Sequence, residues 1–335
     1  MSVEKFNLLD DIYYQKDFIS LYLKKNESIF EFNFNEGDIF FYNIAIKRPI
    51  TQIGNVFVGD GYFDLETAYG YGGYYTNSQD EKFIQRALTV YKERCAEEKI
   101  IAEFIRFHPF NDFPIHYRDS LNFCVYDRDV VYVDLSLTKD ERWTTYSKKT
   151  RNLLRHCERE LSCDKDDNLR GFSNLYNQTM QKNNAQDFYY FGDEYYQNIT
   201  KKSLASLFST SVKGRTVSAG FFMFSNIFAH YHLSANDYEM RNYNANYYLL
   251  DQLFEEAKIL GKSFFLLGGG TTSCEIDSLL KFKKKFSNLT KKFYIGGSIY
   301  NLEVYDQYNK IWDSQAQAIS PYFLKYRLEI KWVYL

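Results

Sequence analysis

The sequence predicts an α/β (α+β) protein of two similar domains, each a mixed twisted sheet flanked by helices. With 335 residues the chain exceeds what one compact core usually holds, so two domains are expected. The same order of strand, loop, helix and strand occurs twice, with helices near residues 80–98 and 247–260. Because sequence identity between the halves is negligible, the repeat is one of pattern, and it indicates two copies of one fold.

In the first half, residues 38–46 (DIFFYNIAI) are mostly β-branched or aromatic, which predicts a strand. Ser78 and Glu81 have the spacing of a capping box, which predicts a helix to about residue 98. Residues 100–107 and 130–135 are apolar runs that predict two further strands. We place the first domain at residues 1–137.

The second domain is placed at residues 138–335, beginning with a basic amphipathic helix. Thr138 and Glu141 form another capping box, which predicts one helix through about Leu161. Residues 216–225 and 227–234 then predict a hairpin. After the helix at 247–260, Gly261 suits the left-handed position that ends helices.

The composition limits the classes of function. The net charge of −2 gives no global field for DNA, and no apolar run approaches the length of a membrane span. The N-terminus lacks the apolar region of a signal peptide, and the five cysteines show no CxxC spacing. These features predict a cytoplasmic protein with reduced thiols, no structural metal and no DNA partner.

A glycine run in the second half is the first candidate site. Residues 263–267 predict a buried strand that continues into Gly268, Gly269 and Gly270, and the basic segment FKKKF follows. A strand that ends in glycines lets a ligand approach the backbone closely, and the lysines add positive charge. The stretch therefore indicates one wall of a site for an anionic or thioester-bearing ligand; the alternative is a tight turn before a solvated basic helix.

Cations also line one side of the predicted helix after Thr138. Lys148, Arg151, Arg155 and Arg159 follow one another at spacings of three, four and four residues. Arg suits bidentate contact with phosphate, so the ridge is a candidate phosphate-facing surface. A solvated helix face is the alternative.

Three segments together resemble the FemAB-type acyltransferases. They are LGGG with the following Asp277-Ser278-Leu279 and Phe282-Lys283, the loop YGYGG at residues 69–73, and the helix KKTRNLLR at 148–155. The resemblance implies two tandem GNAT-like (N-acyltransferase) domains, in agreement with the duplication. It covers roughly residues 38–300, and the chain lacks the long helical-arm insertion that several peptidoglycan-bridge enzymes of the family carry.

The resemblance assigns roles to particular residues. Phe282 and Lys283 match the Phe-Lys pair of the family near the acyl-transfer centre, where Lys283 would stabilise an oxyanion or a donor phosphate. In GNAT domains the donor pyrophosphate rests on a loop before the central helix. Here that loop contains Arg241, Asn244 and Asn246, with Asn in place of both glycines. Asn tolerates left-handed backbone, so the loop is compatible with a degenerate donor site. The resemblance implies acyl-CoA as the donor, with this loop and the triple glycine as its site.

The remaining assignments concern the acceptor and the base. The substrate-binding candidates are Lys148, Arg151, Arg155, Tyr69, Tyr71, Gly72 and Gly73. The candidate bases are His232, Asp237 and Asp277. A hydrogen-bonded core histidine, a helix N-cap at Asp277 and proton transfer through water are the alternatives.

These observations leave three candidate functions. The first is transfer of an acyl group from acyl-CoA to an amine, an amino sugar or precursor of envelope or surface-polysaccharide synthesis, either free or lipid-linked. The second is an aminoacyl-tRNA-dependent peptidyltransferase acting on a peptidoglycan precursor. The third is a decayed carbohydrate- or nucleotide-binding protein. A lipid-linked acceptor would bring the protein to the inner face of the membrane as a peripheral contact.

Overall fold

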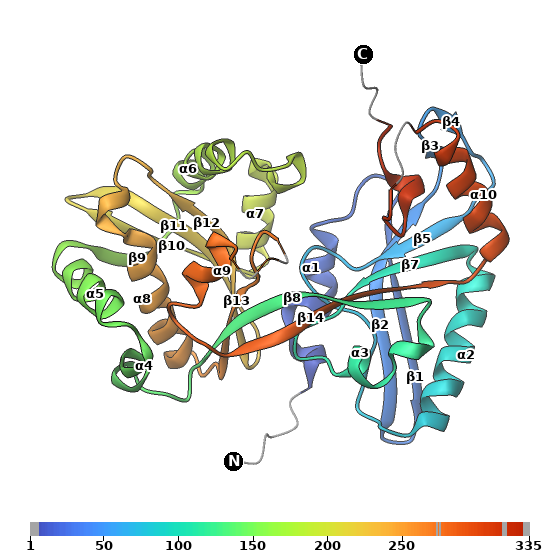
Figure 1. Ribbon diagram of the computed structural model, residues 1–335, viewed down its shortest axis with the longest axis horizontal. Helices are drawn as coiled ribbons and strands as arrows, with labels where there is room; N and C mark the ends of the chain where they lie inside the picture. Colours follow the sequence, from blue (N-terminus) through green and yellow to red (C-terminus); the bar gives the residue numbers. More distant parts are fainter. Residues whose placement is uncertain (1–6, 273, 275, 317–319, 331–335) are drawn as a thin grey trace. The chain divides into compact units, whose positions relative to one another are not determined.

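The computed structural model describes residues 7–272, 274, 276–316 and 320–330 (Figure 1). Its described residues form two compact units: unit 1 holds residues 10–21 and 128–292, and unit 2 holds 7–9, 22–127 and 293–330. The units therefore interleave along the chain, whereas the domain division predicted from the sequence is a single cut after residue 137. None of the described helices is long and apolar enough to cross a membrane.

The sheet of unit 1 is antiparallel except at one pair of strands. Its strands follow the order β8 (Phe123–Asp134), β13 (Phe264–Gly268), β12 (Phe228–Asn236), β11 (Arg215–Phe224), β10 (Ser206–Val212) and β9 (Ser162–Asp166). The predicted hairpin is confirmed as β11 and β12, and the predicted buried strand as β13. Only β12 and β13 pair in parallel among these strands, with a helix in the connection between them.

Helices cover both faces of this sheet (Figure 1). One face carries α4 (Lys139–Thr145), α5 (Lys148–Glu160), α8 (Ala245–Ile259) and α9 (Ser278–Lys283). The other carries α1 (Lys16–Ser20), α6 (Leu169–Lys182) and α7 (Asp193–Lys201). The two faces follow from strand alternation, because Phe222 packs in the α8 core while the neighbouring Phe221 contacts rings of α6 and α7.

The predicted single helix after Thr138 is two helices. The capping box of Thr138 and Glu141 is present and starts α4. Tyr146 then takes an extended backbone conformation, and Ser147 caps α5 by accepting a hydrogen bond from the amide of Thr150. The prediction was wrong here because Ser147 is a strong N-cap residue within a continuous amphipathic pattern.

The sheet of unit 2 has the order β1 (Ser28–Glu36), β2 (Ile39–Pro49), β5 (Phe63–Glu66), β7 (Ile100–Arg106) and β14 (Thr290–Ile299). Helix α2 (Glu81–Glu97) packs on one face. Helix α10 (Leu302–Asp313) packs on the other, with the chain around Leu324 and Tyr326. The short elements are β3 (Gln52–Ile53), β4 (Val56–Phe57), β6 (Tyr75–Thr76), α3 (Phe113–His116) and the 3-10 helices Leu8–Asp10, Ile12–Tyr14, Arg118–Ser120, Asp187–Tyr189, Arg241–Tyr243 and Lys325–Arg327.

The capping box predicted for α2 is absent at Ser78. The helix begins two residues later, and Asp80 is its N-cap, with a side chain that accepts from the amide of Lys82. Ser78 instead accepts from the amide of Asp80 and so supports the turn before the helix. Asp and Ser are equally good N-caps, so the sequence left the choice to the path of the preceding loop.

The predicted duplication is confirmed by the strand pairing. In unit 2 the parallel strands β5 and β7 flank α2, as β12 and β13 flank α8 in unit 1. The two pairs differ beyond their paired segments. In unit 2 the contact continues, because Gly72 bridges Phe107 and accepts a hydrogen bond from the amide of His108 at 3.0 Å.

In unit 1 the pairing of β12 with β13 ends where His230 faces Leu266. Just beyond, His232 is an extra residue in β12, since Tyr231 and Leu233 face the adjacent residues Phe222 and Phe221 of β11. Such a bulge bends a strand and increases its twist. The two parallel strands of unit 1 therefore part at the bulge.

Candidate active site

Lys283 is a buried lysine at the end of α9. Its side chain is 7% exposed, and its Nζ donates a hydrogen bond to the carbonyl oxygen of Gly269 at 2.7 Å. Burial lowers the pKa of Lys283 to about 7, with Arg128 acting in the same direction and Asp277 opposing it. An amine with this pKa exchanges its proton near neutral pH, which is the property a general acid or base needs.

Asp277 holds the loop before α9 and caps the helix. Its Oδ1 accepts from the amide of Leu280 at 2.9 Å, and its Oδ2 accepts from the amides of Thr271 and Thr272 and from the Thr271 hydroxyl. Burial would raise the pKa of Asp277, but these hydrogen bonds outweigh it and hold the pKa below the usual range. The carboxylate is therefore ionised and occupied as an N-cap, so its geometry is that of a structural anion rather than a base.

The three glycines fit closely against the protein's own side chains. A Cβ on Gly269 would lie 2.7 Å from Cδ of Arg128, and one on Gly270 would lie 2.6 Å from Oδ1 of Asp277. Gly268 has φ +82°, a left-handed conformation that favours glycine. Close packing of Arg128 and Asp277 thus accounts for these glycines without a ligand.

Arg128 is a site residue that the sequence analysis missed. Its guanidinium donates to the carbonyl of Gly270 at 2.7 Å, so Arg128 and Lys283 hold consecutive carbonyls of the same loop. Nothing in the surrounding run of alternating charges singles out this arginine. Only the pairing of β8 with β13 brings it to the loop.

Phe282 anchors α9 to α8. Its ring meets Tyr247 edge-on at 4.9 Å and Phe286 at 5.6 Å. Lys285 donates to the hydroxyl of Tyr247 on the same side. Phe282 therefore fixes the helix that carries Lys283, which is a packing role.

The predicted donor loop precedes α8. Asn244 has φ +55°, as expected for Asn in place of glycine, and within the described residues no side chain caps the first turn of α8. Asn246 is engaged: its Oδ1 accepts from the Tyr231 hydroxyl at 3.1 Å and from the Ser234 hydroxyl at 3.4 Å. Arg241 lies over the ring of Tyr238 at 4.3 Å.

The other two candidate bases have partners within unit 1. Nε2 of His232 lies 2.6 Å from the hydroxyl of Tyr195, and burial, aided by His230, lowers the pKa of His232 to about 3. A neutral imidazole with so low a pKa is a weak base. Asp237 forms an ion pair with Arg215 at 2.6 Å near the start of β11.

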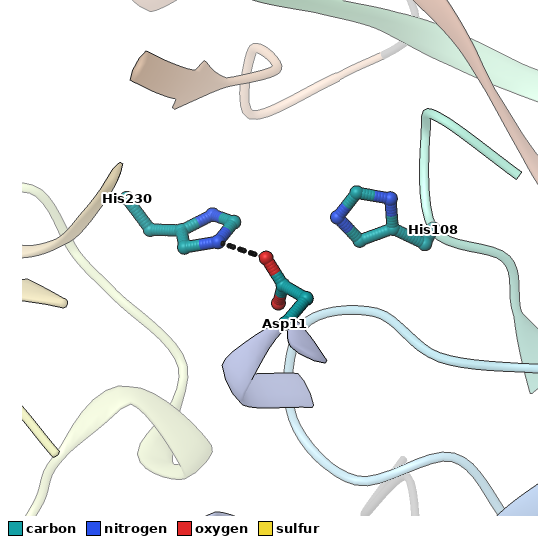
Figure 2. A group of neighbouring side chains, drawn as sticks. All are labelled: Asp11, His108 and His230. Carbon is teal, nitrogen blue, oxygen red and sulfur yellow. Dashed lines mark hydrogen bonds and ion pairs between the residues drawn. The ribbon is translucent and has the colours of Figure 1, made fainter. Parts of the chain in front are cut away.

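The second histidine of the HxH pair has a different partner. Figure 2 shows the 2.8 Å hydrogen bond between Nε2 of His230 and the Asp11 carboxylate. Asp11 also caps the 3-10 helix Ile12–Tyr14 by accepting from the amide of Tyr13. This buried pair attaches the N-terminal segment to β12.

The predicted basic ridge is divided by the structure. Arg151 donates to the carbonyl of Tyr146 at 2.5 Å and so closes the end of α4. Arg155 lies over the Trp143 ring and contacts Asn152. Lys148 is exposed. Of the three ridge residues predicted to bind substrate, Lys148, Arg151 and Arg155, Arg151 is therefore committed to the helix junction.

The YGYGG loop of unit 2 packs against β7. Gly73 has φ +85°, and a Cβ there would lie 2.7 Å from Ile105. Tyr69 stacks on Tyr22 at 5.6 Å, and Tyr71 meets Phe293 at 5.4 Å. These glycines and rings have packing roles within unit 2, and their assignment to substrate binding stays a prediction.

A buried carboxylate below this loop was also missed. Glu103 accepts hydrogen bonds from the hydroxyls of Tyr74, Tyr91 and Tyr300 and from the amide of Asn43. Burial raises the pKa of Glu103, although the hydrogen bonds oppose the increase. The cluster joins five segments of unit 2, and because Glu103 is only 1% exposed it is closed to a substrate.

Comparison with known proteins bears on unit 1 first. Residues 141–284 match the acetyltransferase (GNAT) domain family, and this segment lies within unit 1. No curated protein matches the sequence of the chain.

Solved structures share the fold over most of the chain. The crystal structure of FemX has a TM-score of 0.72 at 13% identity, covering 91% of this chain and 95% of that one. The C-terminal domain of a putative lysylphosphatidylglycerol synthetase from Agrobacterium fabrum has 0.51 at 13%, covering 85% and 87%. L-PGS from Bacillus licheniformis has 0.51 at 15%, covering 82% and 86%.

At such low identities these structures show a common fold, while the match at residues 141–284 adds the enzyme class. The predicted tandem of two GNAT-like domains agrees with the strand–helix–strand unit that occurs once in each unit. The resemblance to FemAB-type proteins is thereby confirmed. The protein is an acyltransferase with a GNAT domain at residues 141–284 and the two-unit fold of FemX.

Proposed function

We propose that the protein transfers an acyl group from acyl-CoA to an amine, and that unit 1 alone holds the donor. The observation that carries the proposal is the buried Lys283, whose Nζ bonds to Gly269 immediately after β13. A lysine with a pKa of about 7 beside a parting strand pair is a group poised for proton transfer.

The donor site is inferred from the difference between the two units. Beside β13, the pairing of the bulged strand β12 with β13 ends at His230, and strand amides at such a point can polarise an acyl carbonyl. The N-terminus of α8 after Asn244 supplies amides for phosphate. In unit 2 the corresponding strands stay in contact through Gly72 and Phe107, which supports a donor in unit 1.

The reaction removes one proton from the acceptor nitrogen and delivers one proton to the sulfur of the donor. The acceptor attacks as a neutral amine, its lone pair forms a bond to the acyl carbonyl carbon, and the positively charged nitrogen so formed loses a proton to solvent. When the tetrahedral intermediate collapses, the C–S bond breaks and the electron pair goes to sulfur. Lys283 in its ammonium form donates a proton to that thiolate and later regains one from water. The carbonyl of Gly269 and the packing of Phe282 hold the amino group of Lys283 in place.

For the acceptor we propose an amino sugar or precursor used in the cell envelope or a surface polysaccharide, free or lipid-linked. The FemX fold and the likeness to lysylphosphatidylglycerol synthetase domains support an envelope setting. A cytoplasmic protein that meets the inner face of the membrane peripherally would suit a lipid-linked acceptor. The location and the acceptor stay predictions.

The test uses acetyl-CoA as the donor, with binding followed by calorimetry and turnover followed by release of free thiol. Lys283→Met keeps the volume of the side chain but removes the proton. Lys284→Ala is the matched control, because Lys284 follows Lys283 in the sequence and its side chain is exposed. We expect Lys283→Met to lose turnover by roughly 10²-fold or more with acetyl-CoA binding retained. Equal turnover in both variants would refute the role of Lys283.

A second candidate is transfer from an aminoacyl-tRNA, and one observation favours it. Helix α5 presents exposed cations, and its Cys157 contacts the carbonyl of Tyr243 at 3.3 Å, next to the donor loop. Positive charge there suits a polyanionic donor. Binding of charged tRNA that weakens steeply with salt, together with no acetyl-CoA turnover, would favour this function. Binding of a sugar or nucleotide without turnover of either donor would favour the decayed binding protein.

A further inference from the structure

The bulge of β12 carries a polar pair that the proposed mechanism does not use. His232 is the extra residue at the bulge, and its Nε2 lies 2.6 Å from the hydroxyl of Tyr195 on α7. Both side chains are partly exposed. The pair therefore lies at the point where β12 leaves β13, two residues after His230.

The pair faces the side of the sheet opposite to the donor loop. Tyr231 stacks on Phe222 and bonds to Asn246 on the α8 side. His232 instead meets Phe18 of α1 and Tyr195 of α7. A donor whose phosphates rest at α8 and whose acyl group enters the gap would expose its carbonyl carbon to an acceptor on the side of Tyr195 and His232.

The protonation state fixes how this pair can act. Burial lowers the pKa of His232 to about 3, so its imidazole is neutral at physiological pH. When Nε2 of this neutral ring is the acceptor, Tyr195 must donate, and its oxygen then offers lone pairs to other partners. A hydroxyl whose proton is already committed recognises N–H donors and discriminates against carbonyl groups.

Building on the proposed function, we propose that Tyr195 binds the acceptor amine by accepting one of its N–H bonds, with His232 as the residue that orients the Tyr195 hydroxyl. The ring of Tyr195 is held by a stack on Phe191 at 4.4 Å, so the hydroxyl is placed by packing as well as by His232. The pair thus selects primary amines on the acceptor side of β12, while the donor side depends on α8 and Lys283.

The first test separates acceptor from donor. With acetyl-CoA as donor and D-glucosamine as acceptor probe, Tyr195→Phe should raise KM for the amine by up to about tenfold, the usual range for one lost hydrogen bond. The Kd for acetyl-CoA should not change. Tyr190→Phe is the matched control, since this tyrosine is exposed before α7. An unchanged KM in Tyr195→Phe, or a weaker Kd for acetyl-CoA, would overturn the inference while leaving the proposed function standing.

The orienting role of His232 needs its own readout. In His232→Gln the amide group can take the place of Nε2, so most of the affinity for the amine should return. In His232→Leu no acceptor remains, and KM should match that of Tyr195→Phe. Equal KM values for the Gln and Leu variants would contradict orientation by a hydrogen bond and leave His232 a packing residue.

A second measurement does not need turnover. By imidazole NMR the His232 signal should stay that of a neutral ring down to pH 5, and D-glucosamine should shift the signals of Tyr195 and His232. A His232 signal that titrates near pH 6.5, or no response to the amine, would overturn the inference. Absence of acetyl-CoA binding and turnover in the wild type would instead refute the proposed function, and the NMR result would still decide the role of the pair.

Discussion

The lowered pKa of Lys283 predicts a pH dependence of the free energy of unfolding that can be measured without any substrate. Its pKa falls from 10.5 to about 7 on folding, so the unfolded chain holds a proton that the folded protein releases at alkaline pH. For a lysine with a depressed pKa, the associated stability is fully present above pH 10.5 and is lost as the pH falls to 7. Between pH 7 and pH 9 the linkage amounts to about 2 kcal/mol.

The perturbation is Lys283→Met, which fills the same space without a charge. The wild type should gain about 2 kcal/mol in free energy of unfolding from pH 7 to pH 9 relative to the variant. Urea denaturation at both pH values measures this difference, with Lys284→Met as the control because that side chain is exposed. If the curves of the wild type and Lys283→Met run parallel across this range, Lys283 has an ordinary pKa and the proton-donor role loses its basis.

The remaining predictions concern the surroundings of Lys283 and the core of unit 1. Asp277 raises and Arg128 lowers the pKa of Lys283, so the alkaline loss of kcat should move to lower pH in Asp277→Asn and to higher pH in Arg128→Gln; shifts of the same sign would contradict this electrostatic account. Asp251 is fully buried, and burial raises its pKa to about 6, so the wild type should lose about 3 kcal/mol of stability as the pH rises from about 4 to 6. Asp251→Asn keeps an oxygen for the Trp143 indole and should abolish that dependence in urea titrations, whereas an unchanged slope would assign it to another group. Gly270→Ala would press on the Asp277 carboxylate and should cost about 1–2 kcal/mol through the lost N-cap of α9, measurable as a lower urea midpoint; Gly192→Ala, which meets no atom within 4 Å, is its control.

Much of the fold could be predicted because local patterns and packing agree. The capping box at Thr138, the glycine after α8 and the apolar run of β11 each correspond to an element in the structure. The duplicated strand–helix–strand order also survives. The interleaving of the units could not be predicted, because it depends on where residues 293–330 pack, and their helix α10 has an ordinary amphipathic pattern.

The candidate site was predictable only where a motif names a residue. Lys283 and Phe282 came from such a motif, and the structure puts both on one short helix. Arg128 and Tyr195 have no motif, and they reach the site through strand pairing and helix packing that connect distant parts of the chain. The burial of Lys283 could not be predicted either. A segment with four lysines indicates a solvated helix face, yet Lys283 is buried while the other three lysines are exposed.

In both glycine-rich loops the glycines lie against the protein's own side chains, and their assignment to ligand binding stays a prediction. Glycine serves close approach of any kind, whether the neighbour is a ligand or the protein itself. Around Gly73 the neighbours are Ile105 and Phe107, and around Gly270 the neighbour is Asp277. The loop expected to hold donor phosphates has Asn244 instead, and it reaches the left-handed backbone without glycine.

It follows that glycine content alone does not mark the donor site. In this pair of units, bare backbone marks where the protein packs against itself, and the parting strands with a buried lysine mark where chemistry is expected. Acetyl-CoA protection of amide hydrogens from exchange at residues 231–236, without protection at 70–74, would support this division. The reverse pattern would place the donor in unit 2.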